Sequence, residues 1–412
     1  MSIIHPFKAF RPKPEFAGEV AARPYDVLNS DEAREEVKGH PLSFLHVGKP
    51  EVDLDPQIDL HDKLVYLKGK ENLQELISKN VLVEDPSPYL YVYAQTMNGR
   101  IQYGLVGCAS VEEYWNEIIK KHELTRQDKE EDRCEHVRVT NSHSGPIFLT
   151  YRDNEEIDAL VAKIVDFPPE NDHFAVDGIR HQCWVIRDRA TIDKIVAIFK
   201  TIPNLYIADG HHRSAAAARV GKERAQANPN HQGSEEYNFF LAVYFPANQL
   251  RILDYNRVVK DLNGMSKEKF LSQLSNFNPI ESKGQLKPSK KGEVGMYLEG
   301  KWYKLTVAPH LQKIADSVLR LDVSILQNHL LDPVLGIKDP RVDKRVDFVG
   351  GIRGLNELER RVNSGEMKVA FSMFPPSLDE LMAIADDGKI MPPKSTWFEP
   401  KLRDGLFVHF LD

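Results

Sequence analysis

Segments typical of strands alternate with segments typical of helices through the middle of this chain, and this alternation constrains the fold more than any other feature. Residues 157–165 and 191–199 have the composition of helices, whereas Cys183–Ile186 and Leu205–Ala208 are short apolar runs typical of strands. A longer apolar run, Phe239–Phe245, predicts a fully buried strand. Elements that alternate in this way pack as helices layered on a sheet. The sequence therefore predicts an α/β or α+β core.

Two local signals place further elements. Residues 89–95 (YLYVYAQ) are rich in strand formers, and a second strand-like run follows the dipeptide Asn98–Gly99. Asn-Gly between two such runs is a strong signal for a β-hairpin. Closer to the N-terminus, Asn29 or Ser30 is placed to cap a helix through residues 31–37.

A domain boundary is expected near residues 250–265. We expect an N-terminal α/β segment over residues 1–84, a catalytic core over residues 85–250 and a C-terminal α+β domain over residues 251–412 that closes over the site. Within the last of these, a polar loop leads into a probable hairpin, and residues 317–331 are helix-like in composition.

Composition excludes several classes of protein. The 412 residues carry a net charge of −7 with a pI near 6.1, which argues against a broadly basic nucleic-acid-binding surface. Cys108, Cys134 and Cys183 have no CxxC spacing, so neither a disulfide framework nor a zinc site is expected. No apolar run approaches the ~18 residues of a membrane span, and the first residues do not resemble a signal peptide. We expect a cytoplasmic protein without a membrane partner; the sequence leaves its oligomeric state open.

The sharpest local feature is residues 205–218, LYIADGHHRSAAAA. A short apolar strand ends at Asp209, Gly210 permits a tight turn, and an alanine-rich helix begins near His211, His212 and Arg213. Backbone N–H groups at a helix start, two imidazoles and a guanidinium around one point suit a phosphate group. Asp209 could hold Mg²⁺ together with phosphate oxygens or orient a hydroxyl. The alternative is that Asp209 caps the helix and the histidines are solvated; a zinc site is weaker still, because no third ligand is near.

A second candidate lies in residues 118–133, IIKKHELTRQDKEEDR. Thr125 followed by Asp128 resembles a capping box, which would start a helix there and leave Glu123 in the preceding turn. A carboxylate in such a turn can point into a cleft as a general base, and His122 beside it could tune its pKa or contact a substrate. The alternative is a solvated, charged helix.

Two further loops offer polar groups. Residues 392–405, PPKSTWFEPKLRDG, are too rich in proline and charge to be core and could either close over a nucleotide or pack the C-terminus onto the domain. Their candidate nucleotide-binding residues are Lys394, Ser395, Thr396 and Arg403. The segment RPYD supplies Arg23 and Asp26, either as substrate contacts or as a rigid turn. The chain has no P-loop, no protein-kinase signature and no dinucleotide fingerprint.

Several dispersed stretches resemble the family catalogued as domain of unknown function 1015. They are RPYDV, HPLSFLHV, HELTRQDKEEDR, YIADGHHRSAAA, YNRVV, FVGGIRG and PPKSTWFEPKLRDGL. Over roughly residues 85–245 the chain is also similar to free serine kinases of the ParB/sulfiredoxin fold, which carry a His-Glu pair upstream of a DGHHR motif. Two features depart from those enzymes: the spacing between the motifs is longer here, and Ser214 follows the motif in place of a tryptophan.

The resemblance implies a ParB/sulfiredoxin-like nucleotide-binding core and transfer of a phosphoryl group from ATP, or less readily ADP, to free L-serine with Mg²⁺. It makes Glu123 the general base and gives Asp209 a supporting role through Mg²⁺ or the serine hydroxyl. It places Gly210, His211, His212 and Arg213 around the phosphate. The alternative is a nucleotide-binding regulator or a DNA-associated ParB-like protein without kinase activity, because this fold also serves such proteins.

Overall fold

All 412 residues are described by the computed structural model, and they form two compact units. The first comprises Met1–Leu250 together with Pro400–Asp412, and the second comprises Arg251–Glu399. The first unit therefore includes residues 400–412. The sequence had placed these residues in the C-terminal domain over residues 251–412. The short strand β20 (His409–Phe410) explains this return, because it pairs with β6 (Ser142–His143) in the first unit.

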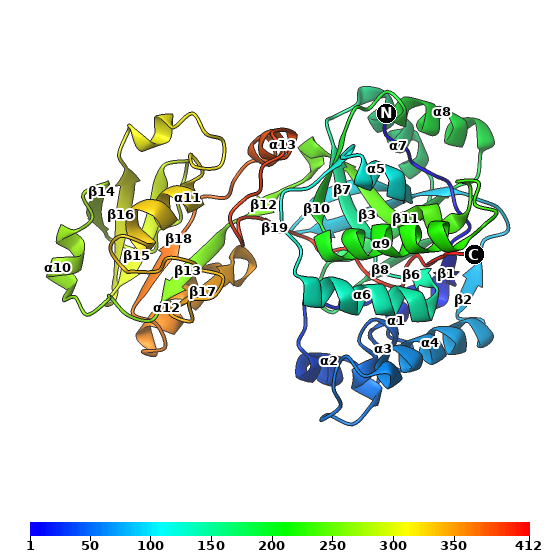
Figure 1. Cartoon of the computed structure of the whole chain (residues 1–412), viewed down its shortest axis with the longest axis horizontal. Coiled ribbons are helices and arrows are strands. Elements are labelled where there is room, and N and C mark those ends of the chain that lie inside the picture. The colour runs from blue at the N-terminus through cyan, green and yellow to red at the C-terminus, as the bar shows by residue number, and fades with distance from the viewer. The chain divides into compact units, whose positions relative to one another are not determined.

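An eight-stranded mixed sheet is the frame of the first unit (Figure 1). Its spatial order is β5-β10-β7-β11-β4-β3-β9-β8. Two neighbouring pairs, β5 with β10 and β7 with β11, are parallel, and the others are antiparallel. The expected mixture of helices and strands is confirmed. The strands are β3 (Leu90–Met97), β4 (Arg100–Ser110), β5 (Ile119–Lys120), β7 (Ile147–Tyr151), β8 (Asn171–Phe174), β9 (Arg180–Ile186), β10 (Leu205–Asp209) and β11 (Phe239–Pro246).

The hairpin predicted at Asn98–Gly99 is present. Met97 at the end of β3 pairs with Arg100 at the start of β4, so the loop has two residues. Both loop residues have positive φ, 53° for Asn98 and 76° for Gly99. A two-residue loop with positive φ at both positions matches the right-handed twist of the strands, and Asn-Gly adopts it at low cost.

Helices α9 and α6 lie side by side on the sheet, as the green and teal ribbons of Figure 1 show. Residues Ala215–Ala218 of α9 are all buried, and their small side chains let the helix approach its neighbours closely. The helices of the first unit are α1 (Ala17–Val20), α2 (Ser30–Glu36), α3 (Leu45–Gly48), α4 (Lys63–Ser78), α5 (Val111–Trp115), α6 (Gln127–Thr140), α7 (Glu155–Val165), α8 (Arg189–Phe199) and α9 (His211–Ala227); β1 (Phe10–Pro12) and β2 (Leu82–Glu84) form a separate ribbon. No helix of the chain combines the length and apolarity needed to cross a bilayer.

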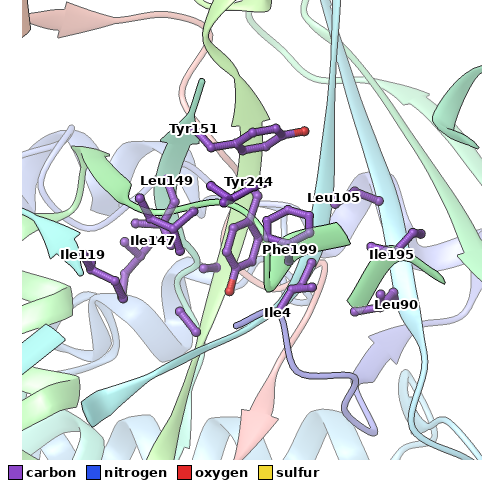
Figure 2. Packing of buried hydrophobic residues seen from close by; sticks show 14 of the residues in the cluster. Ile4, Leu90, Leu105, Ile119, Ile147, Leu149, Tyr151, Ile195, Phe199 and Tyr244 are labelled. Carbon is purple, nitrogen blue, oxygen red and sulfur yellow. The ribbon is translucent and has the colours of Figure 1, made fainter. Parts of the chain in front are cut away.

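Buried apolar side chains join the sheet to the helices that cover it (Figure 2). Leu149 of β7 and Tyr244 of the central strand β11 are fully buried beside Phe199 of α8. Ile4 adds the N-terminal segment to the same cluster. Burying one such side chain contributes about 1.5–3 kcal/mol, so this core fixes the sheet that positions the site.

The second unit contains a six-stranded antiparallel sheet in the order β14-β16-β15-β18-β13-β17. The expected hairpin is β15–β16, but the helix expected over residues 317–331 begins only at Asp322. The elements are β12 (Ile252–Leu253), β13 (Tyr255–Val259), β14 (Phe277–Ser282), β15 (Glu293–Leu298), β16 (Lys301–Val307), β17 (Val346–Gly350), β18 (Val369–Ser372), β19 (Trp397–Phe398), α10 (Lys267–Ser272), α11 (Asp322–Leu326), α12 (Gly354–Asn363) and α13 (Leu378–Asp386).

The tail corrects one expectation from composition. Residues 392–405 were expected at the surface, yet residues 402–405 are all buried. The charged side chains among them have partners: Arg403 forms an ion pair with Asp177, and Asp404 faces Arg213. Burial of charge is tolerated where it is paired in this way.

Candidate active site

Strand β10, Gly210 and helix α9 form the strand–turn–helix unit that the sequence predicts. Gly210 is the N-cap of α9 and has φ of +95°, a left-handed conformation in which a side chain would be strained. No side chain caps the helix, so the alternative role of Asp209 as a helix cap is wrong. The first N–H groups of a helix have no carbonyl partner within it, and at α9 they are available to an anion.

Parallel pairing explains how His122 and Glu123 come to this helix start. Strand β5 pairs in parallel with β10, with Ile119 opposite Leu205 and Lys120 opposite Tyr206. The segments that follow two parallel neighbours leave the sheet at the same edge. The turn after β5 therefore lies beside the turn after β10.

His211 is the residue that links the two turns. It is buried, its ring meets the ring of His122 edge-on with 4.5 Å between centroids, and its Nε2 accepts a 3.5 Å hydrogen bond from the backbone N–H of His122. Its Nδ1 lies 3.9 Å from Oε2 of Glu123. Burial, followed by the neighbouring histidines, holds the pKa of His211 well below its usual value. A neutral ring whose Nε2 accepts must carry its proton on Nδ1, facing the carboxylate of Glu123.

Glu123 is the more accessible partner of this pair, since 46% of its side chain is exposed. It stands between β5 and α6, before the helix, as predicted. The predicted capping box is wrong, however: the N-cap is Arg126, and the hydroxyl of Thr125 donates to Glu130 instead. The reason is local, because Asp128 is engaged by the guanidinium of Arg126 at 2.7 Å.

The other two histidines are also held in place. Nε2 of His212 accepts a 3.1 Å hydrogen bond from the backbone N–H of Arg126, which ties α9 to the start of α6. His122 is 2% exposed, and burial lowers its pKa to about 4 against the opposing effect of Asp209. His211 is buried and His212 is half-buried, so they are not the solvated histidines of the alternative interpretation. Direct contact of His122 with a substrate stays a prediction.

Asp209 lies between two cations. Its Oδ1 is 3.4 Å from Nζ of Lys401, and its Oδ2 is 3.4 Å from Nη2 of Arg213. Burial opposes ionisation of Asp209, but Lys401 and Arg213 keep the pKa of the carboxyl below its usual value. Lys401 comes from the returning tail, 192 residues along the chain, and the sequence gives no signal that joins it to Asp209.

Lys401 and Arg213 affect how the expected Mg²⁺ could bind at Asp209. A divalent ion at Asp209 would be repelled by both Lys401 and Arg213. No group of three His, Cys, Asp or Glu side chains is arranged to hold a metal ion. Mg²⁺ commonly keeps several waters and takes phosphate oxygens as ligands. The residues present therefore fit Mg²⁺ that is held mainly by nucleotide phosphates, with Asp209 as its single carboxylate.

Arg23 and Asp26 of the RPYD segment differ in their placement. Arg23 forms an ion pair with Glu36, which supports the rigid-turn interpretation for this residue. Asp26 is exposed, and its charge helps to raise the pKa of Arg213. The negative charge of Asp26 therefore acts on Arg213 at the start of α9.

The candidate nucleotide contacts of the tail fall into both units. Arg403 belongs to the first unit, where it is 2% exposed and its Nε lies 3.3 Å from Nε2 of His181. Lys394, Ser395 and Thr396 belong to the second unit. There the hydroxyl of Ser395 donates to the carbonyl of Pro392 at 2.6 Å. A role for these four residues in nucleotide binding stays a prediction.

The chain belongs to the family described as Protein of unknown function (DUF1015), whose model matches residues 4–324. This confirms the family resemblance carried by the dispersed motifs. A comparison with curated proteins found no match.

Solved structures with similarity to this chain include a conserved hypothetical protein from Pyrococcus furiosus, with 16% identity, a TM-score of 0.35, and coverage of 74% of this chain and 95% of that chain. A free serine kinase in complex with AMP has 15% identity and a TM-score of 0.35, with coverage of 74% and 92%. SbnI with C-terminal truncation from Staphylococcus aureus has 11% identity and a TM-score of 0.40, with coverage of 74% and 87%. TM-scores below 0.5 transfer no activity, so a function has to be inferred from the residues of the site.

Proposed function

We propose that this chain is a small-molecule kinase that transfers a phosphoryl group from a nucleotide, with ATP expected before ADP, to the hydroxyl of free L-serine. One observation carries the proposal: the accessible carboxylate of Glu123 stands 3.9 Å from Nδ1 of His211, the first residue of the uncapped helix α9. A base is thereby placed at the mouth of an anion site. Serine as the acceptor comes from the motif resemblance.

Glu123 supplies the proton transfer in this scheme. Its carboxylate takes the proton of the acceptor hydroxyl while the oxygen of that hydroxyl bonds to phosphorus and the bond from phosphorus to the leaving nucleotide oxygen breaks. The Nδ1–H of His211 faces Oε2 of Glu123. The imidazole thus holds the base in place.

The helix start supplies the electrostatic part. Phosphoryl transfer needs positioning and charge stabilisation more than covalent chemistry from the protein. The N–H groups after Gly210, with His212 and the cation of Arg213 nearby, are suited to the transferred group. Mg²⁺, when bound with the nucleotide, would neutralise phosphate charge, and Asp209 is the residue that would contact it.

The second class of function is a nucleotide-binding regulator that uses the same helix start without chemistry. Such a protein has no need of a carboxylate at position 123. The two functions therefore differ in whether a phosphomonoester forms and not in whether a nucleotide binds.

Phosphorus NMR of the full chain with Mg²⁺, ATP or ADP, and a panel of free amino acids and polyols tests the proposal. A new phosphomonoester signal that requires L-serine is the expected result, and the nucleotide that supports it identifies the donor. A signal with a different acceptor would retain the kinase and reject serine. Nucleotide binding without any new phosphomonoester would reject the kinase in favour of the regulator.

A further inference from the structure

A small cavity of about 40 Å³ lies in the first unit beside helices α6 and α9. Ile147 and Leu241 give it an apolar wall, and polar and charged side chains line it as well. The side chains that carry its chemistry are Tyr25, Arg133, His143, Ser144, Arg213 and Asp404. They come from sequence segments far apart, and four of them lie in the motifs that mark the family.

Three buried polar atoms on this wall have no partner within the protein: Nε of Arg213, Oδ1 of Asp404 and Nε2 of His143. All three side chains are at least nine-tenths buried. Buried polar atoms are nearly always hydrogen-bonded in folded proteins, to protein, water or ligand. Three such atoms around one cavity indicate that something polar occupies it.

The three atoms divide into one donor and two acceptors. The Nε–H of Arg213 can only donate, and Oδ1 of Asp404 can only accept once the carboxyl has lost its proton. His143 is neutral, because burial holds its pKa well below the usual value. Its Nδ1 lies 3.4 Å from Nδ1 of His409, whose Nε2 is bonded to Glu236 at 2.8 Å. When Nδ1 of His143 donates to His409, Nε2 of His143 accepts from the cavity.

Donors for an anionic group lie on the same wall. Arg133 is fixed by Asp132 at 2.7 Å and by the ring of Tyr25, over which its guanidinium stands at 4.0 Å. The hydroxyl of Ser144 lines the cavity next to Gly145. A carboxylate can therefore find Arg213, Arg133 and a hydroxyl, while an ammonium group finds Asp404 and His143.

Arg213 also connects the cavity to the helix start. Its Nη2 lies 3.4 Å from Asp209, and its Nη1 lies 4.0 Å from Oδ1 of Asp404. Its Nη1 is further held by the carbonyl of Pro146 at 2.7 Å. The guanidinium of Arg213 thus lies between Asp209, at the proposed phosphate site, and Asp404, in the cavity.

We infer that this cavity binds the α-ammonium and α-carboxylate groups of a small α-amino acid, with Asp404 and His143 holding the ammonium and Arg213 with Arg133 holding the carboxylate. This deepens the proposed function and rests on it for the role of the amino acid as phosphoryl acceptor. The volume limits the ligand to short side chains. An ammonium group also supplies the hydrogen-bond donor that Oδ1 of the buried Asp404 lacks.

Isothermal titration of the full chain, with and without nucleotide, tests binding directly. The ligands are L-serine, L-glycerate, which replaces the ammonium with a hydroxyl, and ethanolamine, which lacks the carboxylate. We expect L-serine to bind at least tenfold more tightly than either analogue. Asp404→Asn is expected to weaken L-serine binding at least tenfold, to change L-glycerate binding by less than threefold and to leave nucleotide affinity within twofold. Asp166→Asn, an exposed change at the C-cap of α7, is the matched control.

A second variant keeps the test decisive if Asp404→Asn does not fold. Gly145→Ala removes no charge, but its added carbon would lie 2.9 Å from Oδ1 of Asp404 and so displaces the carboxylate. It should also weaken L-serine. Unchanged L-serine affinity or KM in both variants overturns the cavity assignment, even if serine is phosphorylated. L-serine binding that both variants weaken, without any phosphomonoester, supports the cavity and rejects the kinase.

Discussion

Nδ1 of His211 lies 3.9 Å from Oε2 of Glu123, although the two residues belong to turns that are far apart in the sequence. The contact exists because β5 and β10 run parallel and end at the same edge of the sheet. It joins the residue that begins the anion-binding helix to the carboxylate that the proposed chemistry requires. The contact therefore makes Glu123 the first residue to change.

Glu123→Gln should abolish turnover and preserve nucleotide binding. The amide has nearly the same shape but cannot take a proton, and general base catalysis typically contributes 10²- to 10⁴-fold. We expect a loss of kcat in that range, with nucleotide affinity changed by no more than a few fold. Steady-state kinetics and nucleotide titration measure the two effects.

Glu156→Gln is the matched control. It makes the same chemical change at an exposed position at the start of α7, away from the site. It should retain full activity. Turnover in Glu123→Gln equal to that of the control would remove Glu123 from the role of base.

Gly210→Ala should weaken nucleotide binding. Gly210 has φ of +95°, which costs an L-residue roughly 1–2 kcal/mol, and a methyl group would stand 3.3 Å from Nε of Arg213. Both effects distort the first turn of α9. We expect at least tenfold weaker nucleotide binding by titration, together with a lower melting temperature. Gly178→Ala, at an open position with φ of +78°, separates backbone strain from an effect on binding. Equal nucleotide affinity in the two variants would contradict a phosphate site at this turn.

Arg213→Lys should reduce nucleotide affinity while keeping a positive charge near Asp209. A guanidinium can bind Asp209 and the carbonyl of Pro146 at once, whereas an ammonium is a point charge without that fork. Complete removal in Arg213→Ala would leave the buried Asp404 without the guanidinium that it faces and is expected to cost about 3–5 kcal/mol of stability. Comparing nucleotide affinity in the lysine variant with its melting temperature isolates the binding role. Unchanged affinity in a stable Arg213→Lys protein would argue against contact between Arg213 and the phosphate.

Local chemistry made much of this site predictable from sequence. The turn at Gly210 requires a residue that tolerates positive φ, and the apolar strand and alanine-rich helix around it have strong local signals. The Asn98–Gly99 hairpin is predictable for the same reason. Glu123 was correctly placed before α6, although the capping residue was wrong because Arg126 engages Asp128.

Long-range pairing made the rest unpredictable. Strand β5 has two residues, too few for a periodic pattern, yet its pairing brings Glu123 to α9. The tail is charged, so its composition predicted a surface loop. Its burial depends on partners distant in the chain, which include Asp209 for Lys401 and Asp177 for Arg403. Local sequence patterns do not predict ion pairs between residues so far apart in the chain.

The stability of the unliganded protein should fall between about pH 4 and pH 7 through Asp404. Burial and the charge of Asp26 raise the pKa of Asp404 to about 7 against the opposing effects of Arg213, Arg133 and Arg403. Between the ordinary value of 3.8 and about 7, the unfolded chain ionises this group while the folded chain keeps its proton. The folded state then binds more protons, so the free energy of unfolding decreases as pH rises, by about 1.4 kcal/mol per unit of pKa difference. Asp404→Asn should remove this slope.

Denaturant unfolding of the parent and of Asp404→Asn across pH 4–8 measures the difference between their free energies of unfolding. The contributions of all other titratable groups largely cancel in this difference. The asparagine variant should gain stability relative to the parent as pH rises to about 7, and the difference should be constant above that. Saturating L-serine should shrink the difference in the parent by favouring ionised Asp404 in the folded state. A difference that is independent of pH would show that Asp404 is ionised in the unliganded fold and already has a partner for its charge.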